Sequence, residues 1–164
     1  MAELTKNQNF LQPSGYKITI ERVNYPNLEF FVQSVQHPSV SVPITDVGYP
    51  RASVFMPGEK LVYDEVTFDV LLDEDMNAYI EMHNWLKRLV EDKVRGASER
   101  PLQVPTTADI TLTLLSSHNN VTKKFIYRDC VPTNIGGVQM SSNVTDVTYI
   151  NVPMGFAFTY FDIV

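Results

Sequence analysis

Alternating apolar and polar positions dominate the chain and predict that it is built mainly from β-strands. In the clearest case, residues 63–72, one face carries Val66, Phe68, Val70 and Leu72, and the other carries Glu65, Thr67 and Asp69. The same period of two marks residues 16–23, 30–35 and 109–128, and the last of these reads as a hairpin. This pattern predicts antiparallel sheets with one face in the core.

Residues 75–94 depart from the alternation and predict one α-helix. Their apolar positions recur at helical spacing on one side: Met76, Tyr79, Met82, His83, Leu86, Leu89 and Val90. Asp73 is a candidate N-cap and Gly96 a candidate C-cap. Because His83 falls within the apolar stripe, we expect a histidine buried in the core rather than a metal ligand.

Residues 39–62 keep an extended, β-branched character, but prolines and glycines interrupt it. We expect a long, irregular β-hairpin arm over 43–62. Irregular connections of this length within a compact domain are usually functional. The arm is therefore the first candidate interaction element.

The last predicted strand, residues 149–161, carries no charge on either face. It follows a predicted turn at 132–137, where Gly136 and Gly137 are free to take positive φ. A strand with one face in water alternates more sharply between apolar and polar residues. We therefore expect both faces of this strand to be covered. A chain of 164 residues with one helix can hardly supply both covers. We therefore expect a neighbouring subunit to pack on this strand, at Phe156, Phe158 and Phe161.

Charge is uneven along the chain and argues against nucleic-acid binding. The formal net charge is −6, and residues 59–92 hold ten acids and three bases, or −7, which leaves +1 for the rest. Phosphate binding needs clustered Lys and Arg, which an acidic chain lacks. No stretch reaches the roughly 18 apolar residues of a membrane span, and we expect no secretory signal.

Candidate chemistry is sparse. The single cysteine, Cys130, excludes an internal disulfide and a multi-cysteine zinc site. The three histidines are far apart, and no metalloprotease or nucleophile-elbow spacing is present. Neighbouring acids such as Asp64 and Glu65 are explained by solvated faces and helix caps. We expect no catalytic, cofactor-binding or metal-binding residues, and hence no enzyme.

Four motifs, in this order and spacing, resemble one known family. They are Phe31–Val35 with Pro38; Met56-Pro57-Gly58-Glu59-Lys60 leading into Tyr63–Val70; Asp73-Glu74 followed by Trp85-Leu86; and Val131-Pro132-Thr133-Asn134-Ile135-Gly136 before an apolar last strand. The chain resembles the tail tube proteins of contractile-tailed bacteriophages of the T-even type. More distantly, it resembles the ring-forming tube proteins of contractile injection machines. The resemblance covers about residues 16–162.

We expect one tail-tube domain over residues 1–164, with an inter-ring arm at 43–62 and an N-terminal arm at 1–14 that the resemblance does not cover. Its fold would be mainly β, an antiparallel β-sandwich or barrel with one flanking helix at about 75–94. Copies would form hexameric rings with an inner wall of continuous sheet, and stacked rings would form a conduit for phage DNA. The implied partners are further copies of the chain and the tail sheath, baseplate, tape-measure and tail-terminator proteins. The implied location is the virion tail, assembled in the host cytoplasm, without cofactor or membrane.

Two sets of residues follow as site hypotheses. Within the arm, Gly48, Pro50, Arg51, Phe55 and Pro57 are candidates for reaching the adjacent ring. Glu65 and Asp69, on the polar face of the best strand, are candidates for lining the lumen, where negative charge would repel DNA. An outer, solvent-facing position for the two acids stays equally open.

Two alternatives remain open from the sequence. One is a monomeric ligand-binding barrel in which Phe31, Phe68, Phe156 and Phe158 line an apolar cavity. The other is a related baseplate, tube-end or injection-system tube component, which the same motifs permit. Electron microscopy of the purified protein separates tubes, isolated rings and monomers.

Overall fold

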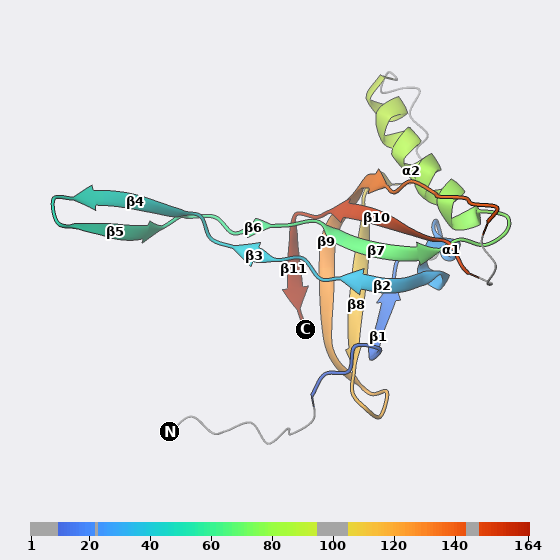
Figure 1. Cartoon of the computed structure of the whole chain (residues 1–164), viewed down its shortest axis with the longest axis horizontal. Coiled ribbons are helices and arrows are strands. Elements are labelled where there is room, and N and C mark those ends of the chain that lie inside the picture. The colour runs from blue at the N-terminus through green and yellow to red at the C-terminus, as the bar shows by residue number, and fades with distance from the viewer. Residues whose placement is uncertain (1–9, 22, 95–104, 144–147) are drawn as a thin grey trace.

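In the computed structural model, two β-sheets share one strand, and a long helix packs at one end of them (Figure 1). The structure describes residues 10–21, 23–94, 105–143 and 148–164. The candidate cap Gly96 and residues 1–9 of the N-terminal arm lie outside them. The elements are β1 (Tyr16–Thr19), α1 (Pro26–Phe30), β2 (Val32–Gln36), β3 (Val40–Ser41), β4 (Ile44–Tyr49), β5 (Ala52–Pro57), β6 (Val62–Tyr63), β7 (Val66–Leu71), α2 (Asn77–Val94), β8 (Ala108–Leu115), β9 (Val121–Ile135), β10 (Asn151–Ala157) and β11 (Tyr160–Ile163).

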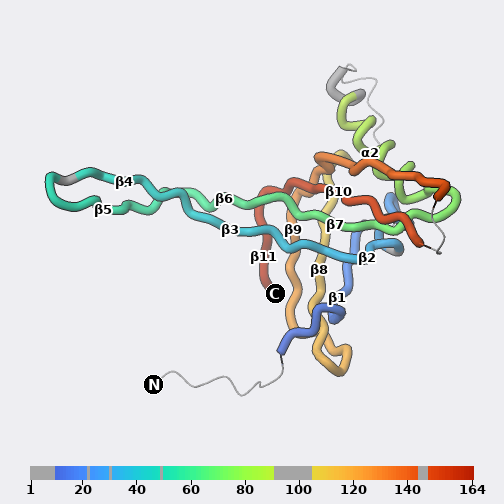
Figure 2. The backbone as a smooth tube through the Cα atoms, viewed as in Figure 1, coloured from blue at the N-terminus to red at the C-terminus, as the bar shows by residue number. Residues whose placement is uncertain are grey.

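We call the two sheets A and B. Sheet A has the order β1-β8-β9-β11, and sheet B has the order β9-β10-β7-β2, with every pair antiparallel. The strands of sheet A run across those of sheet B, and the hairpin β4–β5 extends away from both (Figures 1 and 2). The predicted fold class, mainly antiparallel β with one flanking helix and a hairpin arm, is confirmed.

Strand β9 connects the sheets because it bends in its middle. Its first half pairs with β8 and β11, and its second half pairs with β10. At Asp129, φ is 54°, a left-handed conformation that turns the strand between the two pairings. The predicted turn at 132–137 is therefore wrong over Pro132–Ile135, which continue the strand. Pro132 is tolerated because the register with β10 shifts beside it, between Gly155 and Phe156.

The predicted last strand, 149–161, is two strands that belong to different sheets. β10 ends at Ala157, and β11 then pairs with the first half of β9. Within β10, Val152, Met154 and Phe156 are buried by the chain's own core. The opposite face is open at Asn151 and Pro153. The chain thus covers one face of β10 itself, and cover of the other face by a neighbouring subunit stays a prediction.

The long helix α2 packs through Ala78, Met82 and Trp85, which are all fully buried. The Trp85 ring stacks on Tyr25 with 4.1 Å between centroids and contacts Phe156 at 5.7 Å. The buried stripe is therefore rotated from the predicted one, and His83 is exposed rather than in the core. The largest side chain sets the helix orientation, because burying an aromatic ring is worth roughly 2–3 kcal/mol.

The short helix α1 was not predicted, although Pro26 at its first turn is a helix-start signal. Glu81 of α2 holds its N-terminus. The Glu81 carboxylate accepts hydrogen bonds from the backbone N–H groups of Asn27 and Leu28, both at 3.2 Å, and from Asn27 Nδ2 at 2.6 Å. Asp73 acts similarly on α2, where its Oδ1 accepts the N–H of Asn77 at 2.8 Å. Glu81 thus joins α1 to α2, and Asp73, in the segment after β7, holds the start of α2.

Replacing Glu81 tests this anchoring. We expect Glu81→Ala to lower the free energy of unfolding by about 1–3 kcal/mol, because it leaves N–H groups of α1 without their acceptor. Glu81→Gln keeps an acceptor oxygen and should cost less. Denaturant unfolding measures both, with the exposed Glu59→Ala as control. Equal stability of the wild-type and Glu81→Ala proteins would contradict the anchoring role.

Candidate functional site

The outward face of sheet B is polar and carries acids but no base. On β7, Thr67, Asp69 and Leu71 point away from the core, alternating with the buried Val66, Phe68 and Val70. The outward neighbours on β2 and β10 are Gln33, Ser34, Gln36, Asn151 and Pro153. Both acids proposed from the sequence, Glu65 and Asp69, share this face.

Hydrogen bonds across the strands order this face. Ser34 Oγ donates to Asp69 Oδ2 at 2.6 Å, and Thr133 Oγ1 donates to Glu65 Oε2 at 3.1 Å. A Cβ atom at Gly155 would lie 3.0 Å from Glu65 Oε2. The glycine thus leaves room for the Glu65 carboxylate to cross the β10 backbone. The face is consequently a hydrogen-bonded surface that carries negative charge.

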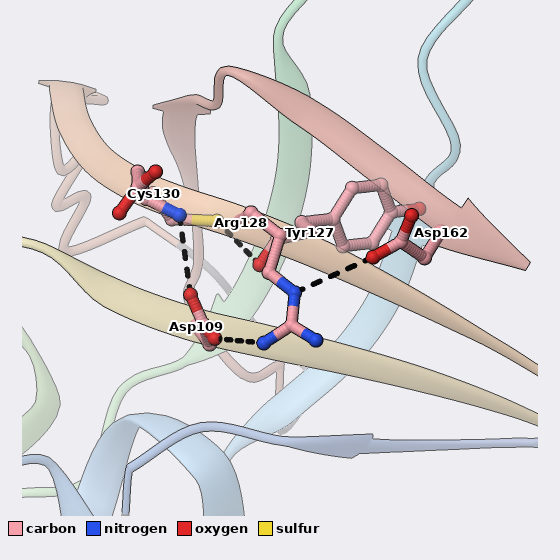
Figure 3. A network of polar contacts seen from close by, with 6 residues as sticks. Asp109, Tyr127, Arg128, Cys130 and Asp162 are labelled. Atoms are coloured by element: carbon pink, nitrogen blue, oxygen red, sulfur yellow. Dashed lines mark hydrogen bonds and ion pairs between the residues drawn. The ribbon is translucent and has the colours of Figure 1, made fainter.

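The outward face of sheet A differs, because there acids and bases are paired. Arg128 of β9 lies between Asp109 of β8 and Asp162 of β11 (Figure 3). Its Nη1 is 2.5 Å from Asp109 Oδ2, and its Nε is 3.5 Å from Asp162 Oδ2. The other Asp109 oxygen accepts the N–H of Asp129 at 3.1 Å, at the bend of β9. This network joins three strands of sheet A, and only sheet B presents acids without bases.

Sheet B has two edges without strand partners in the part of the chain that the structure describes. β2 pairs only with β7, and Val131–Ile135 of β9 pair only with β10. Unpaired edges expose backbone donors and acceptors, which favour pairing with another chain. Beside the β2 edge, a groove of about 690 Å³ opens between the sheets, with Val32, Val35 and Leu112 in its lining. This side of the molecule thus has both polar and apolar groups available for a neighbour.

The arm β4–β5 exposes apolar side chains on both of its faces. Ile44 and Phe55 point to one face and Met56 to the other, with 66%, 69% and 52% of their surfaces exposed. A two-stranded hairpin alone is marginally stable in water. Contact with another surface would therefore stabilise it.

The five arm residues proposed from the sequence all lie in or at the tip of this hairpin. Pro50 and Arg51 form its turn, and Gly48, Phe55 and Pro57 lie in its strands. Their inter-ring contact remains a prediction. The fold supplies the exposed position that such a contact requires.

The three aromatic residues proposed for a subunit contact lie in different environments. Phe156 is only 1% exposed and packs on Phe68, with centroids 5.3 Å apart. Its side chain therefore cannot reach a neighbour, and Phe156 is withdrawn from the proposal. The Phe68–Phe156 contact is core packing and does not fit a ligand cavity lined by these rings. Phe158 and Phe161 are half-buried, and their centroids both lie 5.5 Å from Tyr63 at the root of the arm.

His37, where the chain leaves β2 for the arm, lies in an aromatic environment that was not predicted from the sequence. Its Nδ1 lies 2.6 Å from Tyr127 Oη, and its ring is 4.7 Å from Phe125 and 5.3 Å from Phe161. Burial lowers the pKa of His37 and, together with Cys130, raises the pKa of Tyr127. The only signal in the sequence is Pro38, which follows His37. The aromatic rings around His37 come from β9 and β11, and no local sequence pattern predicts contacts with those strands.

Within the described residues, no group of three or more His, Cys, Asp or Glu side chains could hold a metal ion. None of the described helices is long and apolar enough to cross a membrane.

The free energy of unfolding should decrease as the pH falls, because His37 becomes protonated. Because its pKa is lower in the folded state, the neutral ring favours folding; this contribution is complete above about pH 6.5 and is lost as the pH falls toward the folded-state value. The groups facing the ring are Tyr127, Phe125 and Phe161, and none is an acid. We expect His37→Gln to flatten the dependence of the unfolding free energy on pH between about 7.5 and 5.5. The exposed His83→Gln is the control, and an unchanged slope in His37→Gln would refute the assignment.

Comparison with known proteins gives similarity of structure only. No protein-family model and no curated protein sequence matches the chain. Several solved structures contain chains of similar fold, and three cryo-EM structures are among them. The tube-terminating cap of the anti-feeding prophage matches with a TM-score of 0.67 at 12% identity, covering 98% of this chain and 95% of that one. The 6-fold symmetrised baseplate of the same particle matches with a TM-score of 0.64 at 9% identity, covering 100% and 97%. The extended sheath–tube complex of the PVC extracellular contractile injection system matches with a TM-score of 0.63 at 11% identity, covering 95% and 92%. The chain thus shares its fold with chains found in these contractile injection particles.

Proposed function

We propose that this chain is a structural tube protein of a contractile tail, whose copies join into hexameric rings that stack into a conduit. The observation that carries the proposal is the construction of sheet B: four strands, an unpaired edge at either end, and an outward face with acids and no base. The shared fold and the sequence resemblance to T-even-type tail tubes support the same assignment.

Strand directions in sheet B suit a closed ring. The order β9-β10-β7-β2 is antiparallel throughout, so β2 and β9 run in opposite directions. Pairing β2 of one copy with Val131–Ile135 of the next continues the alternation without a break. Repetition around a ring removes both free edges and forms one continuous inner wall.

The polar face of sheet B then lines the lumen, with Glu65 and Asp69 on its surface. Negative charge repels phosphate groups, and a wall without Lys or Arg offers no affinity through counterion release. DNA, or a measuring protein before it, could slide past such a wall. The mixed-charge face of sheet A would turn outward, toward a sheath. Baseplate and terminator proteins would close the two ends, in a virion tail assembled in the host cytoplasm.

A second candidate is a tube-end component, favoured by the likeness to a tube-terminating cap. A tube-body protein forms long tubes from itself alone, whereas an end component stops at one or a few rings. Negative-stain electron microscopy of the concentrated protein distinguishes the two. A stable monomer at high concentration would contradict both and favour a ligand-binding module.

Removing the arm should separate ring formation from stacking. We expect deletion of residues 48–58 to leave soluble rings that do not stack, because the arm lies outside both sheets. Phe55→Ser tests the same contact without shortening the chain, since Phe55 is exposed in the single chain. Electron microscopy scores tube length. Tubes of normal length from both variants would refute a stacking role for the arm.

Cryo-EM of assembled tubes tests the lumen assignment. We expect density for the side chains of Glu65 and Asp69 on the inner wall, and for Asp109 and Arg128 on the outer surface. The reverse placement would exclude sheet B as the lumen wall while leaving tube formation intact.

A further inference from the structure

A second groove lies at the end of sheet B away from the arm. It has a volume of about 290 Å³, and its apolar lining comes from Leu72, Met76, Val138, Met140, Tyr149 and Ile150. Met140 and Tyr149 are 72% and 77% exposed, so the groove presents a large apolar surface to solvent. Glu74 also lines the groove and is itself exposed.

The groove and the arm lie at opposite ends of the same strand. β6 carries the chain from the arm into β7, and Leu72, directly after β7, donates its N–H to Ile150 O at 3.0 Å in the groove lining. In Figure 1 the hairpin β4–β5 extends along the direction of β7, away from the end near α1. A second copy displaced along this strand direction therefore brings its arm to the groove of the first.

The arm is complementary to the groove in chemistry as well as position. Its faces carry Ile44, Phe55 and Met56, which the single chain leaves exposed. Its tip carries the exposed base Arg51, and the groove rim carries the acid Glu74. An apolar hairpin with a basic tip thus fits an apolar groove with an acidic rim.

We propose that the arm of one copy docks in this groove of the copy in the next ring, with Arg51 against Glu74. The inference rests on the proposed tube function and names the surface that receives the arm. Because the arm and the groove lie at opposite ends of the β7 direction, each copy offers its arm to one neighbour and accepts the arm of another, and the contact propagates as a stack.

Cysteine cross-linking tests the docking directly. The native Cys130 is fully buried, and burial raises its pKa to about 12, so it should not react under mild oxidation. In the assembled double variant Arg51→Cys/Glu74→Cys, we expect a ladder of cross-linked oligomers. The matched control Arg51→Cys/Lys17→Cys places the second thiol on the exposed outer face of sheet A and should give no ladder.

Charge reversal provides an independent measurement. Arg51→Glu should raise the protein concentration at which tubes appear by about tenfold or more, because repulsion recurs at every copy around the ring. Adding Glu74→Arg should restore the wild-type concentration.

The outcomes separate this inference from the proposed function. Two results overturn the docking alone. In one, tubes form but the Arg51→Cys/Glu74→Cys chains cross-link no more than the control chains. In the other, Glu74→Arg does not restore tube formation to the Arg51→Glu protein. Failure of the wild-type chain to form any ring or tube overturns the proposed function and the docking with it.

Discussion

The architecture depends on one strand that belongs to two sheets. β9 pairs with β11 up to Arg128 and with β8 up to Cys130, and after the bend at Asp129 it pairs with β10 from Val131 onward. The last residue pair between β8 and β9 is Ala108 with Cys130, which leaves the far side of Val131–Ile135 unpaired. The same bend that closes the core around Trp85 and Phe156 thus creates an open edge on sheet B. The single chain buries its core and leaves its backbone edges for a neighbour.

Local alternation and spacing were enough to predict much of this fold. The strand β7, the β8–β9 hairpin and the helix α2 each bury one face, so their sequences carry the period of their structure. The arm was predictable because prolines and glycines interrupt an otherwise extended run. That Glu65 and Asp69 lie on the same face of the sheet was predictable from the alternation of side chains along a strand.

The errors have a common cause, because each depended on contacts distant in sequence. Pro132 reads as a turn, yet a register shift opposite it lets β9 continue. The apolar run after Tyr149 gives no sign of passing from sheet B to sheet A. The face of α2 was misjudged because Tyr25, far earlier in the chain, stacks on Trp85 and sets the helix rotation. Phe156 likewise finds its cover within the chain, on Phe68.

Hydrogen–deuterium exchange tests most directly whether sheet B is completed by a neighbouring copy. Edge amides exchange quickly when only water accepts their hydrogen bonds, and slowly when another strand does. Comparing dilute and assembled protein, we expect exchange to slow at both Val32–Gln36 and Val131–Ile135, with little change in the already paired β7. Edge amides that exchange equally fast in both states would contradict ring closure through sheet B.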